Sequence, residues 1–403
     1  MNSENLEALR REVRDWLRAN LPKGWGTPEY VPPERYSRES HELGKEWTKK
    51  LYDAGYTGFN YPKEYGGIER PREEVAVIRE EMGRTGTPGG PLSLGLLVAA
   101  PAIVVHGEEW QKKRFIPKIL SGEESWCEGF SEPDAGSDLA NVQTTAVRDG
   151  DEWVVNGQKV WTSMWEFADW GLLVAKTEPD AARHRNLSYF LFDTSTPGFS
   201  RRPLVQMSGE AEFGEMFFDD MRIPHENMMG EQGRGWYVAM TALAAERSGG
   251  GTGFSDMGAM GGLGTSDLLS ANSLVELAKN TKRYGKSVWE ESSFRQRIIQ
   301  TAIELEAMRW SGARLAAKMR MGQPFGNEAS VLKNFQAEMR TRRGDLTCEI
   351  LGAYSQMVRG STRAVDEGDH VYNMLRARGA TIEMGTSEIN RNIVAERILG
   401  LPR

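Results

Sequence analysis

The sequence predicts a multidomain α+β protein in which a β-rich segment lies between two helical segments. Apolar residues recur at helical spacing from residue 2 to about residue 122, and again from about residue 235 to residue 399. The β-rich runs between them are each bounded by Gly, Pro, Asn or Asp, and are Thr144–Val147, Trp153–Val155, Gly171–Ala175, Leu187–Asp193 and Glu215–Phe218. Because the strands are segregated from the helices, the pattern argues against an alternating parallel sheet.

The length of the chain favours several cooperating domains. At 403 residues it exceeds the size at which a single core usually keeps growing. We predict an N-terminal helical domain over residues 1–122, a middle β-domain over 123–230 and a C-terminal helical bundle over 231–403. A hydrophobic content of 39% with 27% charged residues is that of an ordinary globular protein.

The most apolar stretches are those of buried or surface helices. The first one is amphipathic, with apolar residues at helical spacing among charged ones, namely Leu6, Leu9, Val13, Trp16, Leu17 and Leu21. The run Leu92–Val105 has 14 residues and is broken by Gly95 and Pro101, which is too short for a bilayer. We therefore expect neither a secretory signal nor a membrane span.

Charge and cysteine content narrow the classes of partner. A net charge of −7 disfavours nucleic acids and anionic membranes. Cys127 and Cys348 lie far apart without a CxxC motif, which favours a reducing compartment such as the cytoplasm. Two thiols cannot build a zinc or iron–sulfur site and the five histidines lack metal-ligand spacing, so we expect no metal.

The stretch Cys127–Ser163 carries the most specific motifs. A strand-like run breaks into a turn rich in small residues and donors, Ser131–Asp138. Two turn dipeptides, Asp149-Gly150 and Asn156-Gly157, are spaced to fold short strands back on each other. A β-domain that gathers this turn with Trp161 and Ser163 could hold a flat, phosphate-bearing cofactor such as a flavin.

These motifs resemble the acyl-CoA dehydrogenase family. Glu132-Pro133-x-x-Gly136-Ser137-Asp138 followed by Asn156-Gly157-x-Lys159-x-Trp161 is similar to the signature of the family's middle domain. The resemblance continues, in the family's order, at Tyr61–Gly67, Gly107–Gly122, Phe217–Pro224 and Gly385–Ile389. It implies a helical domain, a barrel-like or sandwich-like β-domain and a four-helix bundle.

The resemblance also implies an FAD site. Phe130 and Ser131 would border the isoalloxazine, Trp161 would lie against one face, and Ser163 would lie near the hydride-accepting nitrogen. The remaining members of the predicted cofactor site are Gly136, Ser137, Thr386 and Glu388, with Ser137 also expected at the substrate. Without the resemblance, the same residues read as a turn and a core tryptophan.

The turn Gly385–Glu388 opens a helix. Its free N–H groups favour an anionic or hydrogen-bonding ligand. A simple N-cap at Thr386 or Ser387 explains the sequence equally well. In the family this turn abuts the flavin and the thioester, so both interpretations stay open.

The catalytic base is expected at Glu246. Many family members carry a glutamate immediately before the Gly-Thr of this turn, where this chain has Met384. Branched-chain and long-chain types instead take it from the first helix after the β-domain, before an arginine, and this chain has Glu246-Arg247 there. Arg247 is then expected near the substrate, and the backbone N–H of Met384 as an oxyanion donor. The alternative is an exposed Glu-Arg pair.

The predicted reaction is the α,β-dehydrogenation of an acyl-CoA thioester to the 2,3-enoyl-CoA, in fatty acid or lipid catabolism. The resemblance implies FAD, an electron-transfer flavoprotein as acceptor, and a tetramer of one or two chain types. One rival is a flavin oxidase or monooxygenase of the same fold. Another is a non-catalytic subunit of a heteromeric acyl-CoA dehydrogenase.

Two further segments depart from the family. Half of the residues of Gly249–Gly264 are glycine, which reads either as a loop or as an interruption that widens the acyl pocket for a bulky group. Lys282 or Arg283 stands near the place of an arginine that meets a neighbouring flavin, and Glu349 replaces a usual glutamine. Ordinary solvated charges are an equal interpretation.

Overall fold

The computed structural model describes residues 3–402 except 28, 60, 89–93, 248–270, 322, 324 and 325. The chain divides into two compact units, Met1–Gln206 with Ala211–Gly262, and Met207–Glu210 with Leu263–Arg403. Each is described by itself below. The segment Gly249–Gly264 lies outside the described residues, so its role stays a prediction.

The first unit joins helices to one sheet. Its α-helices are α1 (Ser3–Asn20), α2 (Arg38–Asp53), α3 (Arg72–Thr85), α4 (Ala100–His106), α5 (Glu109–Ser121) and α6 (Gly235–Arg247), with a π-helical turn η2 (Gly95–Ala99) before α4. The sequence sets the ends of several of them. The Ser37 side chain accepts a hydrogen bond from Ser40 N at 3.1 Å to begin α2, and Gly122, at φ 77°, ends α5.

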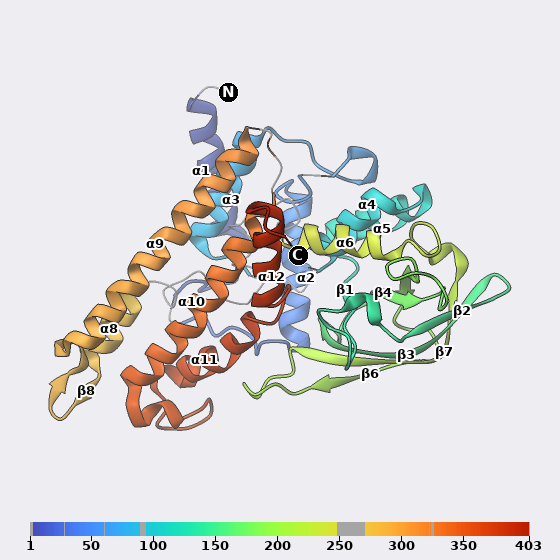
Figure 1. Ribbon diagram of the computed structural model, residues 1–403. Coiled ribbons are helices and arrows are strands. Elements are labelled where there is room, and N and C mark those ends of the chain that lie inside the picture. The colour runs from blue at the N-terminus through green and yellow to red at the C-terminus, as the bar shows by residue number, and fades with distance from the viewer. Residues whose placement is uncertain are drawn as a thin grey trace. The chain divides into compact units, whose positions relative to one another are not determined.

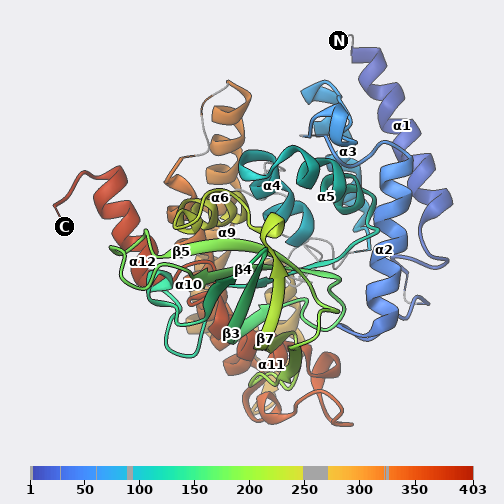
Figure 2. The ribbon, with the colours of Figure 1, turned by 90° about the vertical axis from the view of Figure 1, so that its right-hand side faces the viewer.

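The seven strands of the first unit form a single curled sheet (Figure 2). They are β1 (Trp126–Gly129), β2 (Thr145–Asp149), β3 (Glu152–Ser163), β4 (Trp170–Lys176), β5 (Leu187–Asp193), β6 (Phe199–Leu204) and β7 (Phe213–Pro224). The order is β1-β4-β2-β3-β7-β6, with β5 paired to β4. β4 is parallel to β1 and β2, and the other pairs are antiparallel.

Alternation along the central strands creates two cores. Trp126, Leu172 and Tyr189 point to the face that packs against η2, α4, α5 and α6. Their neighbours Cys127 and Phe190 point to the opposite face, into the interior of the curled sheet. Because both faces are covered by apolar side chains, these strands read as nearly continuous apolar runs.

Of the two predicted turns, one is observed and the other is not. Asp149-Gly150 lies at the β2–β3 hairpin as predicted, with Gly150 at φ 62°. The prediction of a second turn at Asn156-Gly157 is wrong, because this dipeptide lies inside β3 at a β-bulge. A Cβ on Gly157 would lie 2.4 Å from Thr144 Oγ1, so the close approach of the chain requires glycine.

The second unit is helical. Its helices are α8 (Ala271–Asn280), α9 (Ser292–Arg320), α10 (Glu328–Leu351), α11 (Asp369–Ala380) and α12 (Ser387–Ile393), with the short hairpin β8 (Lys282–Arg283) and β9 (Lys286–Ser287) between α8 and α9 (Figure 1). α9 and α10 are the longest, with 29 and 24 residues. Apolar residues of α8, α9 and α10 form its core.

The predicted fold class is confirmed, with helices first, a curled sheet in the middle and helices last. The predicted domain boundaries stay a prediction. Within the described part of the chain, every helix is too short or too polar to cross a bilayer.

Candidate functional site

A buried ion pair holds the Ser131–Asp138 turn against β3. Lys159 Nζ donates to Glu132 Oε1 at 2.9 Å and to Phe130 O at 3.0 Å. The other contacts of the Glu132 carboxylate are the backbone N–H groups of Gln143 and Thr144, at 2.5 and 2.9 Å. The two motifs that carry the family resemblance are therefore joined physically.

The groups around Lys159 and Glu132 determine whether each side chain is ionised. Burial lowers the pKa of Lys159 to about 8, although the Glu132 carboxylate opposes this. Burial alone would raise the pKa of Glu132, but the Lys159 charge and the two N–H groups hold it below its ordinary value. At neutral pH both groups are ionised. The pair fixes the backbone of Phe130 and Ser131 beside β3, where Val160 N donates to Ser131 O at 2.9 Å.

The turn presents small exposed residues. Ser131 is half-buried, Gly136 and Ser137 are exposed, and Phe130 is buried. A Cβ built on Gly136 meets no atom within 4 Å, so space is open there. Exposed backbone beside a glycine suits the approach of a phosphate or ring oxygen.

A second irregularity in β3 displays Trp161. The register with β7 shifts between Lys159 and Thr162, and Trp161 lies there at φ 62°, a conformation that is costly for a bulky residue. Its ring is 55% exposed and meets Phe213 edge-on, with centroids 5.9 Å apart. Thr162 Oγ1 is buried without a partner among the described residues, and Ser163 is half-buried at the strand end.

These features fit a flavin. The exposed ring provides a stacking face, and the unpartnered hydroxyl and the open glycine turn provide hydrogen bonds. All of them belong to the first unit.

α6 turns Glu246 toward the sheet. Ala239 and Ala242 are fully buried against β4 and β5, and Glu246 follows them by seven and four residues on the same helix face. Glu246 is half-buried, and its charge acts on Glu128 of β1. The side chain of Arg247 lies outside the described residues, so its predicted role is a prediction still.

Close packing at the start of α6 needs glycine. A Cβ on Gly235 would lie 2.4 Å from the Ser188 carbonyl carbon in β5. The helix therefore starts in direct contact with the sheet, which brings its later turns over the same face.

In the second unit, the turn before α12 has an unusual backbone. Met384 lies at φ 55° and Gly385 at φ 85°. Gly385 O accepts hydrogen bonds from Lys333 Nζ at 2.6 Å and from Asn390 Nδ2 at 2.7 Å. These hydrogen bonds hold the Gly385–Thr386 peptide in place, and the role of the Met384 N–H stays a prediction.

The open question of the N-cap is settled by hydrogen bonds. Thr386 Oγ1 accepts from Ile389 N at 3.2 Å, whereas Ser387 Oγ donates to Glu338 Oε1 at 2.9 Å. The cap is Thr386. Glu388 is exposed, and hydrogen bonds from its own backbone and from Thr386 lower its pKa.

Two of the residues at which the chain departs from the family, Arg283 and Glu349, line a cavity of about 490 Å³ in the second unit. It is lined by Arg283, Phe294, Asp345, Cys348, Glu349, Gly352 and Ser355. Lys282, by contrast, is exposed. Glu349 Oε1 pairs with Arg297 Nη2 at 2.8 Å, and this hydrogen-bonded arginine lowers the pKa of the glutamate. The charge of Glu349 is therefore compensated by Arg297.

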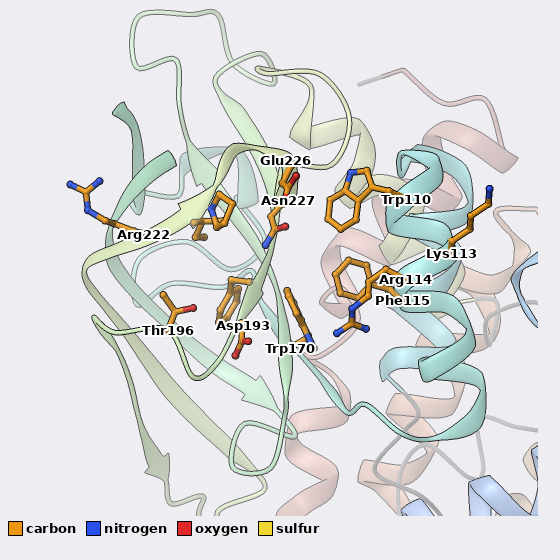
Figure 3. A pocket seen from close by; sticks show the side chains of 13 residues that line it. Trp110, Lys113, Arg114, Phe115, Trp170, Asp193, Thr196, Arg222, Glu226 and Asn227 are labelled. Carbon is orange, nitrogen blue, oxygen red and sulfur yellow. The ribbon is translucent and has the colours of Figure 1, made fainter. Parts of the chain in front are cut away.

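Another cavity of the first unit lies away from these residues. It measures about 820 Å³ and is lined by Trp110 and Phe115 of α5, Trp170 of β4 and residues at the end of β7 (Figure 3). No predicted site residue lines it. Arg114 lies over the Phe115 and Trp170 rings, at 4.9 and 5.6 Å from their centroids. The Arg114 guanidinium also donates hydrogen bonds to Glu124, so its charge already has a partner within the protein.

Sequence reasoning missed the roles of Lys159 and Thr162. Lys159 belongs to one of the two middle-domain motifs and Glu132 to the other, so the presence of both motifs was the available signal. No sequence signal marks the orphaned hydroxyl of Thr162. Among the described residues, no group of three His, Cys, Asp or Glu side chains could hold a metal ion.

Comparison with known families covers nearly the whole chain. The model of the acyl-CoA dehydrogenase N-terminal domain matches residues 3–123, that of the middle domain residues 127–221, and that of the C-terminal domain residues 233–399. All three thus occur in order along the chain.

Individual relatives agree. The acyl-CoA dehydrogenase IpdE1 of Mycobacterium tuberculosis is 35% identical, with 99% of each chain covered. A solved structure titled Tcur3481-Tcur3483 steroid ACAD has a TM-score of 0.77 at 29% identity, covering 100% of this chain and 99% of that one. The ChsE4-ChsE5 complex from Mycobacterium tuberculosis gives a TM-score of 0.75 at 29% identity, with the same coverage.

Proposed function

Because this chain belongs to the acyl-CoA dehydrogenase family of FAD-dependent oxidoreductases, we propose that it oxidises a bulky acyl-CoA thioester to the 2,3-enoyl-CoA with Glu246 as the base. The observation that carries this proposal is the orientation of Glu246. Its carboxyl lies on the sheet-facing side of α6, half-buried beside an apolar core. A carboxylate in such surroundings is a suitable proton acceptor at neutral pH.

Trp161, Ser163 and the Ser131–Ser137 turn would contact the flavin, with Phe130 behind them. The resemblance to the family adds Thr386 and Glu388 as further proposed cofactor residues. When bound, FAD supplies the acceptor for the hydride that leaves the β-carbon. The strained, exposed Trp161 and the unpartnered Thr162 hydroxyl support this assignment.

Residues of the protein would accept the α-proton and bind the thioester carbonyl. Glu246 would take the α-proton onto a carboxylate oxygen, and the Met384 N–H would donate to the thioester carbonyl as negative charge develops there. Met384 lies in the same turn as the Gly385 carbonyl, which hydrogen bonds from Lys333 and Asn390 hold in place. Arg247 and Ser137 would contact the substrate.

The relatives support a bulky acyl group and a two-chain assembly. One similar structure is titled a steroid ACAD, and two have titles that join two protein names. The exposed apolar face of α9 supports burial against another chain, since Ile299, Ile303 and Trp310 recur at helical spacing while being 47%, 57% and 63% exposed. Within that assembly, Arg283 would contact a neighbouring flavin.

Electrons would pass to an electron-transfer flavoprotein. A flavin oxidase remains the rival of the same fold, and rapid oxygen consumption with an acyl-CoA would favour it. A non-catalytic subunit is the other rival. Absence of flavin from the visible spectrum of this chain purified alone would favour that rival.

The test is anaerobic titration of the flavin-loaded protein with short, branched and polycyclic acyl-CoAs. We expect flavin bleaching with bulky substrates, and a loss of at least about 1,000-fold in bleaching rate for Glu246→Gln, because the amide cannot accept the proton. Glu383→Gln is the matched control, since Glu383 already pairs with Arg376 at 3.0 Å. Bleaching that survives Glu246→Gln unchanged removes Glu246 from the mechanism.

A further inference from the structure

The sheet face beneath α6 carries two polar side chains among apolar ones. Trp126 belongs to the core that packs against α6, and Cys127 belongs to the opposite core. Because side chains alternate along a strand, Glu128 returns to the α6 face. It lies opposite Leu172 of β4, another member of that core.

Tyr189 of β5 belongs to the same core. It pairs with Val174 on β4, and its ring meets that of Phe130 edge-on with centroids 5.7 Å apart. The tyrosine is fully buried, yet its hydroxyl has no partner among the described residues. A buried hydroxyl without a partner is costly, and native proteins rarely leave one unless a ligand or water completes it.

The surroundings of Glu128 favour the protonated form of its carboxyl. Burial and the nearby charge of Glu246 raise its pKa well above the ordinary value. Burial and the Glu128 charge likewise raise the pKa of Tyr189. Both shifts favour the neutral forms, in which each group carries an O–H that can donate a hydrogen bond. Glu128 is half-buried, while its neighbours Trp126, Cys127 and Gly129 are buried.

We propose that Glu128 and Tyr189 form a hydrogen-bonding subsite beside Glu246 that binds a ketone or hydroxyl oxygen carried on the acyl group. This inference rests on the proposed function, because it takes Glu246 to face the acyl group. Two O–H donors match the two lone pairs of one carbonyl oxygen. An anionic group on the acyl chain would be repelled by Glu246, and a purely alkyl chain would leave both donors unpaired.

The test measures binding and requires no turnover. The protein carries Glu246→Gln, its FAD and any partner chain, and is titrated calorimetrically with pairs of acyl-CoAs that share one carbon skeleton. One member of each pair has a keto group, which is moved along the skeleton from pair to pair. We expect one keto position to bind about 10-fold more tightly than its deoxy counterpart, as for one or two hydrogen bonds in a buried site.

Variants assign that preference to the two donors. Tyr189→Phe and Glu128→Leu should each reduce the ratio to about 3-fold or less, whereas Glu128→Gln, which keeps a neutral donor, should retain it. Tyr56→Phe is the control, because it removes a buried hydroxyl that donates to Glu12 at 3.0 Å. Melting temperatures show that the variants are folded.

The subsite proposal is overturned if no keto position is preferred, or if the preference survives both Tyr189→Phe and Glu128→Leu. Tighter binding of deoxy compounds would also overturn it, since that result indicates a resident water. Failure of the base assignment shows instead in the bleaching experiment, which this binding ratio does not use.

Discussion

Glu128 and Glu132 are two carboxyls four residues apart, and they have opposite fates. Glu132 is buried beside the Lys159 ammonium and two backbone N–H groups, and its pKa lies below the ordinary value. Glu128 lies on the α6 face, where burial and the charge of Glu246 raise its pKa. Burial acts on both, so the nature of the neighbouring group decides which of them is charged.

The difference separates structural from functional use of the same residue type. Glu132 has its hydrogen bonds satisfied and holds the motif turn to β3, which is an architectural role. Glu128 stands near a second acid and an unpartnered hydroxyl, an arrangement that costs stability. Such costs are commonly retained where a ligand completes the site.

The largest expected effect comes from breaking the Glu132–Lys159 pair. Lys159→Met leaves the Glu132 carboxylate buried without its cation, so we expect the free energy of unfolding to fall by about 3–5 kcal/mol. Chemical denaturation measures this loss. The double variant Lys159→Met with Glu132→Gln should cost less than Lys159→Met alone, because no uncompensated charge remains. Strictly additive costs would show that the two groups do not act as a pair.

The next effect is a pH dependence that arises from Glu128. Its folded-state pKa lies above the unfolded value of 4.5, so between these values the unfolded chain has lost a proton that the folded chain keeps. Raising the pH in this window therefore destabilises the wild-type protein, by up to about 1.4 kcal/mol per pH unit. Glu128→Gln has no such proton. Its free energy of unfolding should therefore increase relative to that of the wild type as the pH rises.

Urea denaturation of both proteins at several values between about pH 5 and pH 8 measures the difference. Tyr56→Phe serves again as the control and should follow the wild-type curve. Parallel curves for wild type and Glu128→Gln would mean that Glu128 ionises normally.

The smallest effect on stability is expected at Trp161, two residues from Lys159. Trp161→Asn places a residue that tolerates positive φ at the bulge, and removes a ring that is 55% exposed. We expect the free energy of unfolding of the flavin-free protein to change by no more than about 1 kcal/mol, while flavin is lost on gel filtration. Trp110→Asn, at a ring 39% exposed, is the matched control. Equal flavin retention in both variants would contradict the stacking role.

Much of the fold could be predicted from the sequence. Helical periodicity and turn residues located the three segments, and the run Leu187–Asp193 matches β5 at both ends. The strand-like run before Ser131 corresponds to β1, but β6 and the full length of β3 and β7 were not predicted. β3 continues through Asn156-Gly157 because a bulge absorbs the irregularity, and a bulge has the same turn-forming residues as a hairpin.

The candidate site was likewise predicted only in part from the sequence. The sequence by itself determined which residue types are available, namely Glu246 before Arg247, Met384 in place of a glutamate, and the motifs around Glu132 and Lys159. Only the tertiary structure decided their states. Whether a carboxyl is charged depends on groups that arrive from other strands and helices, such as Lys159 for Glu132 and Glu246 for Glu128, and sequence spacing does not encode that proximity.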